Sequence, residues 1–340
     1  MHDNLLNNLN PEQQKVVKHT DGPMIVLAGA GSGKTRVLIY KVLYLMEAKH
    51  AEPEDILMVT FTNKAAREMK ERIDSSIHAG GKPMITTFHS LCAKILRIDG
   101  QHAGLSNSYV IYDGQDQLDA IKQAMEKLGV SPKEFRPQAL LGAISDAKNQ
   151  LLSSQEYLTF ARGTFQVTAA KVYIMYQKIL TENQALDFDD LLLVTVNMFQ
   201  KNPEVLAKYQ NRFKYILIDE YQDTNRAQYV LTKLLAKKWH NICVVGDFSQ
   251  SIYSWRGADF QNLSRFKDDF KGTKTFALSQ NYRSTQKILD AASAVIAKNT
   301  SHPVLELWTE NEQGENLKLY EARNEQDEAM YIMNFLAPLH

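Results

Sequence analysis

The residues best suited to chemistry form a glycine-rich run near the N-terminus that reads AGAGSGKT. Its glycines permit a tight backbone path that points successive N–H groups at phosphate oxygens, and a following helix would add the positive end of its dipole. Lys34 would reach the β and γ phosphates, and the Thr35 hydroxyl would bind Mg²⁺. The pattern therefore predicts a nucleoside triphosphate site. The residues expected to contact the nucleotide here are Ala28, Gly29, Ala30, Gly31, Ser32, Gly33, Lys34, Thr35 and Arg36.

Two neighbouring acids, Asp219 and Glu220, follow an apolar run and could supply the rest of this chemistry. If that run is a strand beside the loop, both carboxylates lie at the edge of the sheet where phosphates would bind. Asp219 then fits a Mg²⁺ contact, and Glu220 fits the group that orients or deprotonates the attacking water. Such a pair is otherwise often a solvated turn or a helix cap, but the upstream loop and the following Gln222 and Asp223 disfavour that interpretation. No NKxD guanine signature occurs, so ATP is favoured over GTP.

These side chains need a sheet to bring them together, and the apolar pattern predicts one. Helical patterns follow the first two apolar runs, which is the alternation of a doubly wound α/β fold. The predicted fold class is therefore α/β, with a parallel sheet flanked by helices. The runs predicted as buried parallel strands are Met24 to Ala28, Ile56 to Thr60, Ile85 to Thr87, Tyr215 to Ile218 and Ile242 to Val245.

The rest of the chain reads differently. Between about Leu91 and Arg212 helical periodicity takes over, which indicates a helical insertion. After a further apolar run at Phe276 to Leu278, the expected elements are a helix near Gln286 to Lys298, weak strands at Val304 to Trp308 and Leu317 to Tyr320, and a helix through Ala329, Ile332, Met333 and Leu336. Two strands and two helices are too few to close a layer, so we expect the start of a domain whose remainder is absent. The predicted division is 1–90 and 214–278 for a first ATP-binding domain, 91–213 for the insertion and 279–340 for the incomplete second domain.

Composition sets limits on the class of protein. Hydrophobic residues make up 44% and charged residues 23%, which is typical of a globular protein, and no apolar stretch is long enough to span a bilayer. We see no secretory signal and expect a cytoplasmic protein without a membrane partner. Only Cys92 and Cys243 occur, so neither a disulfide framework nor a zinc site is supported. Because 39 basic residues balance 39 acidic ones, any nucleic-acid binding must come from a local patch or from stacking.

Taken in order, the motifs resemble those of the superfamily 1 DNA helicases of the UvrD/Rep/PcrA type over essentially the whole chain. Any one short motif is weak evidence, but seven in family order are specific. The matching segments are LNPEQQ (Leu9 to Gln14), AGAGSGKT (Ala28 to Thr35), TFTNKAA (Thr60 to Ala66), TFHS (Thr87 to Ser90), IDEYQD (Ile218 to Asp223), VGDFSQSIYSWRGA (Val245 to Ala258) and QNYRS (Gln280 to Ser284). The resemblance implies a RecA-like P-loop NTPase domain with a helical insertion, followed by the start of a second RecA-like domain.

The resemblance also implies further nucleotide contacts. Gln13 would read the adenine edge through its amide, which offers a donor and an acceptor together. Tyr282 would stack on the adenine ring. Gln250 and Arg283 would contact the γ-phosphate, and the forked guanidinium of Arg283 suits phosphate oxygens. The expected catalytic set is Lys34, Asp219, Glu220, Gln250 and Arg283, with Thr35 and Asp219 holding Mg²⁺.

Contacts with single-stranded DNA are implied in the same way. Aromatic side chains stack on bases of any identity for about 1–3 kcal/mol each, so a neutral protein can still bind DNA. Phe61 has a second interpretation as a core residue, and a tryptophan at a strand exit is often buried packing. The residues implied to bind DNA are Phe61, Thr62, Asn63, Lys64, Thr87, His89, Tyr253, Trp255 and Arg256.

The expected function is therefore ATP-driven 3′ to 5′ translocation on single-stranded DNA, with unwinding at single-strand/duplex junctions, in repair or replication. The later family motifs V and VI are missing from these residues, so we expect an N-terminal portion of a longer helicase. Two alternatives remain open. One is a module that binds ATP and single-stranded DNA with negligible turnover in isolation, and the other is a P-loop kinase, which leaves the DNA motifs unexplained.

Overall fold

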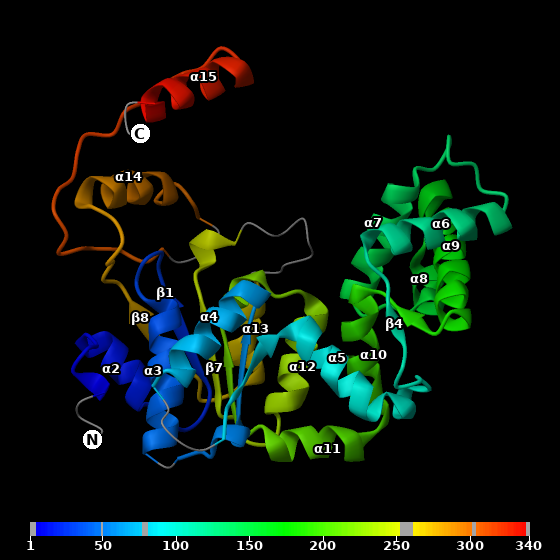
Figure 1. Ribbon diagram of the computed structural model, residues 1–340, viewed down its shortest axis with the longest axis horizontal. Helices are drawn as coiled ribbons and strands as arrows, with labels where there is room; N and C mark the ends of the chain where they lie inside the picture. Colours follow the sequence, from blue (N-terminus) through cyan, green and yellow to red (C-terminus); the bar gives the residue numbers. More distant parts are fainter. Residues whose placement is uncertain (1–4, 49, 77–80, 252–260, 301–303, 338–340) are drawn as a thin grey trace.

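A six-stranded parallel sheet lies at the centre of the molecule (Figure 1). The computed structural model describes residues 5–48, 50–76, 81–251, 261–300 and 304–337. The sheet has the order β3-β2-β6-β7-β1-β8, so chain segments far apart in sequence become neighbours. Its strands are β1 (Met24–Ala28), β2 (Ile56–Thr60), β3 (Met84–Thr87), β6 (Tyr215–Ile218), β7 (Ile242–Gly246) and β8 (Lys274–Leu278).

The α/β fold class and all five predicted strands are confirmed. β1, β2 and β6 have the predicted bounds, whereas β3 begins one residue earlier and β7 ends one residue later. The sixth strand, β8, had been recognised only as an apolar run. It pairs with β1 at the edge of the sheet and exposes most of its residues, so its sequence lacks the pattern of a buried strand.

Alternate strand residues point into two separate cores. On one face Ile25, Leu57 and Ile216 pack in one cluster, and on the other Met24, Met58 and Leu217 pack in a second. The helices that cover the second cluster are α2 (Pro11–Lys18), α3 (Lys34–Glu47) and α4 (Asn63–Asp74). Those that cover the first are α5 (Phe88–Asp99), α10 (Phe188–Lys201), α11 (Pro203–Arg212), α12 (Arg226–Ala236) and α13 (Gln261–Asp269).

The middle of the chain builds a helical lobe with its own core (Figure 1). Its helices are α6 (Gly114–Lys127), α7 (Pro137–Asn149), α8 (Ser154–Phe160) and α9 (Gly163–Glu182). Two short parallel strands pair where the chain enters and leaves this lobe. They are β4 (Val110–Ile111), just before α6, and β5 (Ala185–Leu186), just after α9. Helices thus fill most of the stretch in which the sequence predicts helical periodicity, and α6 ends at Lys127 with Leu128 as its C-cap.

The C-terminal segment carries α14 (Gln286–Ile296) and α15 (Glu325–Leu336), both predicted. The weak strands predicted at Val304 to Trp308 and Leu317 to Tyr320 are wrong. Among the described residues these segments form no ladder, and the one pairing is an isolated bridge between Trp308 and Gln280. A strand exists only through a hydrogen-bonded neighbour, and Leu319 is 98% exposed.

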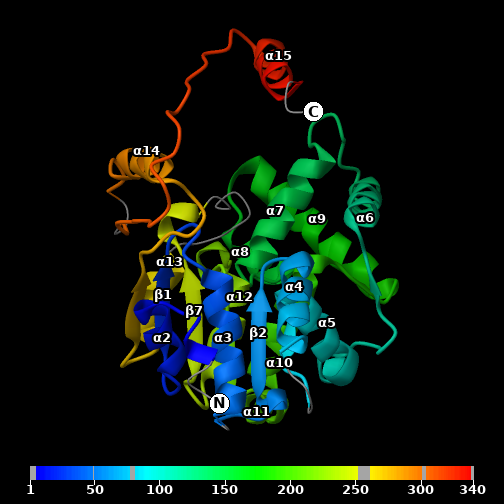
Figure 2. The same ribbon diagram turned by 60° about the vertical axis from the view of Figure 1, so that its left-hand side comes forward.

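The labelled sheet strands in Figure 2 run towards the side of the molecule on which α14 stands. The carboxyl ends of the parallel strands therefore face the C-terminal segment. None of the helices in the described part of the chain is both long and apolar enough to cross a bilayer.

Candidate functional site

The glycine-rich loop runs from the end of β1 to the start of α3, as predicted. Gly31 and Gly33 have φ angles of +68° and +87°, which side chains rarely tolerate. The loop is held together by the Ser32 hydroxyl, which donates to the Gly29 carbonyl at 2.7 Å. Since Lys34 is the first residue of α3, the unpaired N–H groups of the first helical turn lie at the loop and suit an anion.

Three predicted catalytic residues, which follow β1, β6 and β7 in the chain, meet at this loop. Lys34 Nζ lies 3.2 Å from Glu220 Oε2 and donates to Gln250 Oε1, also at 3.2 Å. Gln250 Nε2 in turn donates to Asp247 Oδ2 at 2.6 Å. The sheet order explains the meeting, because β6 and β7 lie side by side and β7 borders β1. A phosphate placed at Lys34 would therefore lie within reach of both the Glu220 carboxylate and the Gln250 amide.

Asp219 supports a cation site. The carboxyl is only 5% exposed, and burial together with the neighbouring Glu220 raises its pKa to about 7. The Thr35 hydroxyl lies near it and partly offsets this rise in pKa, so the two proposed Mg²⁺ ligands are neighbours. No cluster of three or more His, Cys, Asp or Glu with metal-ligand geometry occurs among the described residues. Mg²⁺ commonly takes one or two protein oxygens, with phosphates and waters filling the other positions, so this hydroxyl and carboxylate fit it.

Sequence reasoning gave no role to Gln222, which organises the acids. Its amide Nε2 donates to Glu220 Oε2 at 2.9 Å and to Asp223 Oδ2 at 3.2 Å, while its Oε1 accepts from the Asp247 backbone N–H at 3.1 Å. Glu220 itself has a φ of +51°, which is uncommon outside glycine and often marks a functional site. The motif letters IDEYQD contained Gln222, but no spacing rule indicated this bridge.

The predicted adenine residues lie next to the loop but are engaged within the protein. Gln13 is 2% exposed, its Nε2 donates to the Ser32 carbonyl at 3.1 Å, and its Oε1 accepts from the Asn10 N–H at 3.2 Å. The Tyr282 hydroxyl accepts from Asn10 Nδ2 at 2.8 Å, and its ring is 47% exposed. The Arg36 guanidinium donates to the backbone carbonyl of residue 8 at 2.7 Å. An adenine at Gln13 would have to share or replace these hydrogen bonds.

The C-terminal segment closes over the loop. Asn281 Nδ2 donates to the Ala30 carbonyl at 2.6 Å, and the Tyr282 N–H donates to the Gly31 carbonyl at 2.9 Å. A Cβ on Gly31 would lie 2.7 Å from the Arg283 Cβ, so this predicted phosphate contact begins beside the loop. Asn281 was not predicted, although it lies inside the QNYRS motif between residues that were.

Phe61 connects the nucleotide residues with the predicted DNA residues. It lines a cavity of about 330 Å³ together with Thr35, Asp219, Glu220 and Gln250. It also lines a second cavity of about 420 Å³, whose other lining residues are His89, Gly142, Ser145, Asp146, Asn149, Asp189, Asp223, Asn225 and Gln228. Phe61 is therefore a shared wall and not a core residue, since it is only half-buried.

The remaining predicted DNA residues lie at helix starts on this side of the sheet. Thr62 caps α4, and its hydroxyl accepts from the Ala65 N–H at 3.1 Å. Thr87 caps α5 and donates to Asn63 Oδ1 at 3.4 Å, which joins the two motifs. Lys64 is exposed in the first turn of α4. Tyr253, Trp255 and Arg256 lie outside the described residues.

The second cavity has an acidic lining. Burial and a neighbouring carboxylate raise the pKa of Asp189 and of Asp223 to about 6. Burial lowers the pKa of His89, whose ring packs edge-on against Phe188 at 6.2 Å between centroids. The carboxylates of this cavity repel phosphate but accept hydrogen bonds from uncharged N–H groups, so its acidic side suits a base better than a backbone.

Comparisons with known proteins agree with the motifs. The model of the UvrD/REP helicase N-terminal domain matches residues 9–271, and that of the UvrD-like helicase C-terminal domain matches residues 276–340. The ATP-dependent DNA helicase PcrA of Bacillus subtilis (strain 168) is 49% identical over 99% of this chain and 46% of its own length. The protein of the same name in Staphylococcus aureus (strain Mu50) is 48% identical over 97% of this chain and 45% of its own length.

The chain thus spans about half the length of the curated relatives it matches. Among solved structures, the Pif1 helicase from Candida albicans matches with a TM-score of 0.36 and 13% identity, over 79% of this chain and 40% of that chain.

Proposed function

This chain belongs to the UvrD/REP helicase family, and from that premise we propose that it binds ATP and Mg²⁺ and couples ATP hydrolysis to 3′ to 5′ movement on single-stranded DNA. Within a complete protein, that movement would unwind DNA at single-strand/duplex junctions during repair or replication. The relatives named above are ATP-dependent DNA helicases.

One observation carries the proposal. Phe61 lines both the cavity that holds Thr35, Asp219 and Glu220 and the cavity that holds His89. A nucleotide in the first cavity would therefore lie beside a side chain that also faces the predicted DNA residues. An enzyme that only phosphorylates a small molecule has no need of such a shared wall.

We assign the nucleotide roles as follows. Lys34 binds the β and γ phosphates. Glu220, whose Oε2 lies 3.2 Å from Lys34 Nζ, orients the attacking water. Gln250 senses the γ-phosphate through its hydrogen bond to Lys34, and Arg283 reaches it from the C-terminal segment. Thr35 and Asp219 would hold Mg²⁺, which when bound neutralises charge on the phosphate oxygens. Gln13 and Tyr282 would hold the adenine.

The proposed DNA contacts follow the carboxyl edge of the sheet. Stacking would come from Phe61, Tyr253 and Trp255, and backbone contacts from Thr62, Asn63, Lys64, Thr87, His89 and Arg256. In the proposed domain division, 1–90 and 214–278 form the first RecA-like domain, 91–213 the helical insertion and 279–340 the start of a second RecA-like domain.

An alternative is a module that binds ATP and single-stranded DNA with negligible turnover on its own. The coverage of the loop favours it, because a Cβ on Gly29 would lie 2.4 Å from the Leu307 side chain and Asn281 holds the Ala30 carbonyl. Phosphates would then have to displace the C-terminal segment before they reached the loop.

Steady-state ATPase assays with and without poly(dT) separate these functions. They are run on the 340-residue chain and on the polypeptide of its complete reading frame, with Lys34→Ala as the test variant and the exposed Lys122→Ala as its control. We expect at least about tenfold DNA stimulation in the longer protein, lost in Lys34→Ala but kept in Lys122→Ala. Turnover that ignored DNA would rule out the translocase, and turnover confined to the longer protein would favour the module for the isolated chain.

A further inference from the structure

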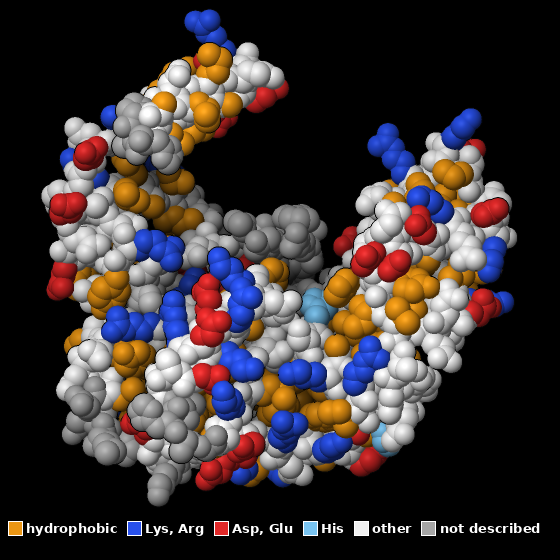
Figure 3. Space-filling model, in the orientation of Figure 1, with side chains coloured by type: hydrophobic (Ala, Val, Ile, Leu, Met, Phe, Trp, Pro, Cys, Tyr) orange, Lys and Arg blue, Asp and Glu red, His pale blue; other side chains and the backbone are white. Residues whose placement is uncertain are grey.

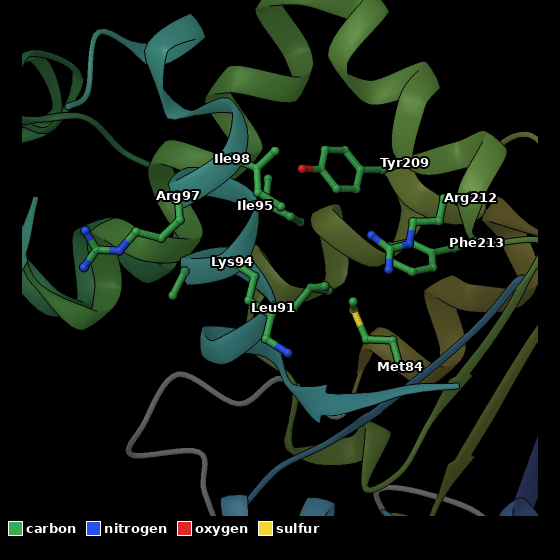
Figure 4. Close-up of a pocket in the computed structure, with 10 residues that line it drawn as sticks. Met84, Leu91, Lys94, Ile95, Arg97, Ile98, Tyr209, Arg212 and Phe213 are labelled. Atoms are coloured by element: carbon green, nitrogen blue, oxygen red, sulfur yellow. The ribbon is translucent and has the colours of Figure 1, made fainter. Parts of the chain in front are cut away.

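A third cavity, called here the α5–α11 pocket, lies at the end of the sheet away from the predicted nucleotide residues. It has a volume of about 450 Å³ and lies between β3, α5 and α11 (Figure 4). Met84 is the first residue of β3, and Phe213 comes just before β6, so the pocket is at the amino ends of the strands. The loop, Glu220 and Gln250 all lie at the carboxyl ends. This pocket is therefore not part of the nucleotide or DNA site.

The pocket is apolar inside. The side chains of Leu91, Ile95 and Ile98 point into it from α5, with Met84 and Phe213 opposite (Figure 4). Ile98 remains 53% exposed, although it sits among other apolar groups. In Figure 3 a hydrophobic patch is visible between α5 and α11, with Lys and Arg side chains around it. Exposed apolar surface with a polar rim is typical of an interaction site.

Three basic residues lie at the rim of the pocket. Lys94, Arg97 and Arg212 line the pocket, and none forms a salt bridge with an Asp or Glu that the structure describes. The Arg97 guanidinium is directed away from the pocket (Figure 4), where it donates to the Asn107 carbonyl at 2.7 Å and lies over the Tyr109 ring at 4.0 Å. Arg212 lies over the Phe213 ring at 5.3 Å. Asp99, a buried acid at the end of α5, is already paired with Lys208 at 2.8 Å.

We propose that this pocket docks a short acidic segment of a partner protein, in which one bulky apolar side chain enters the pocket and flanking carboxylates meet Lys94 and Arg212. The apolar interior receives the anchor, and Lys94 and Arg212, which form no salt bridge with a described acid, supply specificity for Asp and Glu. This surface adds to the proposed function without depending on it.

Single-stranded DNA fits the pocket less well. DNA binds to platforms of exposed aromatic rings, which stack on bases. The aromatic residues that line this pocket, Tyr209 and Phe213, are 3% and 1% exposed, and the Tyr209 hydroxyl is used by Asp99 at 2.6 Å. The lining offers aliphatic surface to an aliphatic or aromatic anchor, and it offers no ring face to a base.

Fluorescence anisotropy with labelled peptides of about 12 residues tests the proposal. The probes carry one Leu, Phe or Trp flanked by Asp and Glu, and matched probes carry Lys in place of the acids or Ser in place of the anchor. We expect acidic anchored peptides to bind, with affinity that falls as salt rises. Ile98→Glu and Lys94→Glu should each weaken that binding by at least about tenfold.

The control variants are Phe160→Glu and Lys171→Glu, which likewise replace an apolar and a basic side chain with Glu, at exposed positions on α8 and α9. Both should bind the acidic peptides as wild type does, and circular dichroism melting should show all four variants folded. The proposal is overturned if no acidic anchored peptide binds more tightly than its Lys or Ser version, or if Ile98→Glu binds like wild type. It is also overturned if Lys94→Glu weakens dT20 binding as much as peptide binding, because the cations would then serve DNA.

Discussion

The folded protein opposes ionisation of the Asp219 carboxyl. Burial and Glu220 raise the pKa of this carboxyl to about 7, whereas an unfolded chain would give it an ordinary value near 3.9. The folded state therefore binds the proton more tightly, and this contribution to stability is complete below pH 4 and is lost as pH rises to 7. We expect Asp219→Asn to raise the free energy of unfolding at pH 8 relative to wild type, and to have little effect at pH 4.5.

Urea unfolding of the nucleotide-free chain between pH 4.5 and 8 measures this effect. The slope that the variant removes should not exceed about 1.4 kcal/mol per pH unit for one group. Asp290→Asn, at an exposed position on α14, serves as the control and should leave the profile unchanged. Equal destabilisation by Asp219→Asn at both pH values would mean that the carboxyl is ionised throughout.

Gln222 positions Glu220 without reaching the loop itself. Its amide joins Glu220, Asp223 and the Asp247 backbone, and it is 1% exposed. Gln222→Ala would free Glu220 to move. We expect kcat for ATP to fall by about 10-fold to 100-fold with KM changed less than about threefold, because Lys34 and the loop still bind the phosphates.

Steady-state kinetics on Gln222→Ala and on the exposed Gln115→Ala separate this role from a general loss of fold. The control should match wild type in both constants. A rise in KM at constant kcat would instead make Gln222 a nucleotide-binding group.

For single residues, the sequence predicted which side chains lie at the candidate site better than it predicted the contacts between them. Lys34, Glu220 and Gln250 could be named because loop chemistry and motif order point to them. The bridge by Gln222 occurs beside the positive φ of Glu220, and the Asn281 contact depends on where the C-terminal segment lies. Neither the backbone angle nor that packing leaves a periodic trace in the sequence.

Elements were predictable where burial is two-sided. β1, β2 and β6 lie inside the sheet and read as continuous apolar runs, so their bounds followed from the sequence. β8 lies at the edge, exposes most of its residues and was not assigned as a strand. The opposite error occurred at Leu317 to Tyr320, where apolar alternation suggested a strand that finds no neighbour among the described residues.

A buried ion pair network joins α7 to α10 in a way that the helical periodicity did not indicate. Lys148 is fully buried, with Nζ 2.7 Å from Asp187 Oδ2 and 2.8 Å from Asp190 Oδ1. Burial alone would raise the pKa of Asp187, but Lys148 holds it below the ordinary value. Lys148→Met leaves both carboxylates buried without a cation, and we expect a loss of about 3–5 kcal/mol at pH 8.

The same variant should lose less stability at pH 5. Without Lys148 the carboxyl pKa values rise in the folded state, so the protein is favoured while they are protonated and penalised as pH increases through those values. Chemical unfolding at pH 5 and pH 8 checks this, with the exposed Lys171→Met as the control. The same loss at both pH values would show that the damage is steric and not electrostatic.

At the scale of the whole molecule, the helical lobe and the C-terminal segment rise on either side of an open hollow above the sheet (Figure 3). The sequence predicted that three parts exist, but not that Asn281 and Leu307 would lie on the loop. Contacts between distant segments depend on how the folded surfaces of those segments fit together. The local spacing of apolar and polar residues does not encode that fit.

The proposed coupling between nucleotide and DNA would pass between two neighbouring cavities, and it can be tested at Phe61. Phe61 lines the cavity of Thr35 and Glu220 and also the cavity of His89, so truncating its side chain removes part of the wall between them.

If DNA binding stimulates ATP hydrolysis through this side chain, Phe61→Ala should lower the ratio of DNA-stimulated to basal ATP turnover by about tenfold. The same variant should weaken dT20 binding by about 1–3 kcal/mol. Phe160→Ala, which removes an exposed ring from α8, should keep the wild-type ratio. A Phe61→Ala variant with weaker DNA binding but an unchanged ratio at saturating DNA would show that Phe61 only holds the strand, and that the coupling passes through other contacts.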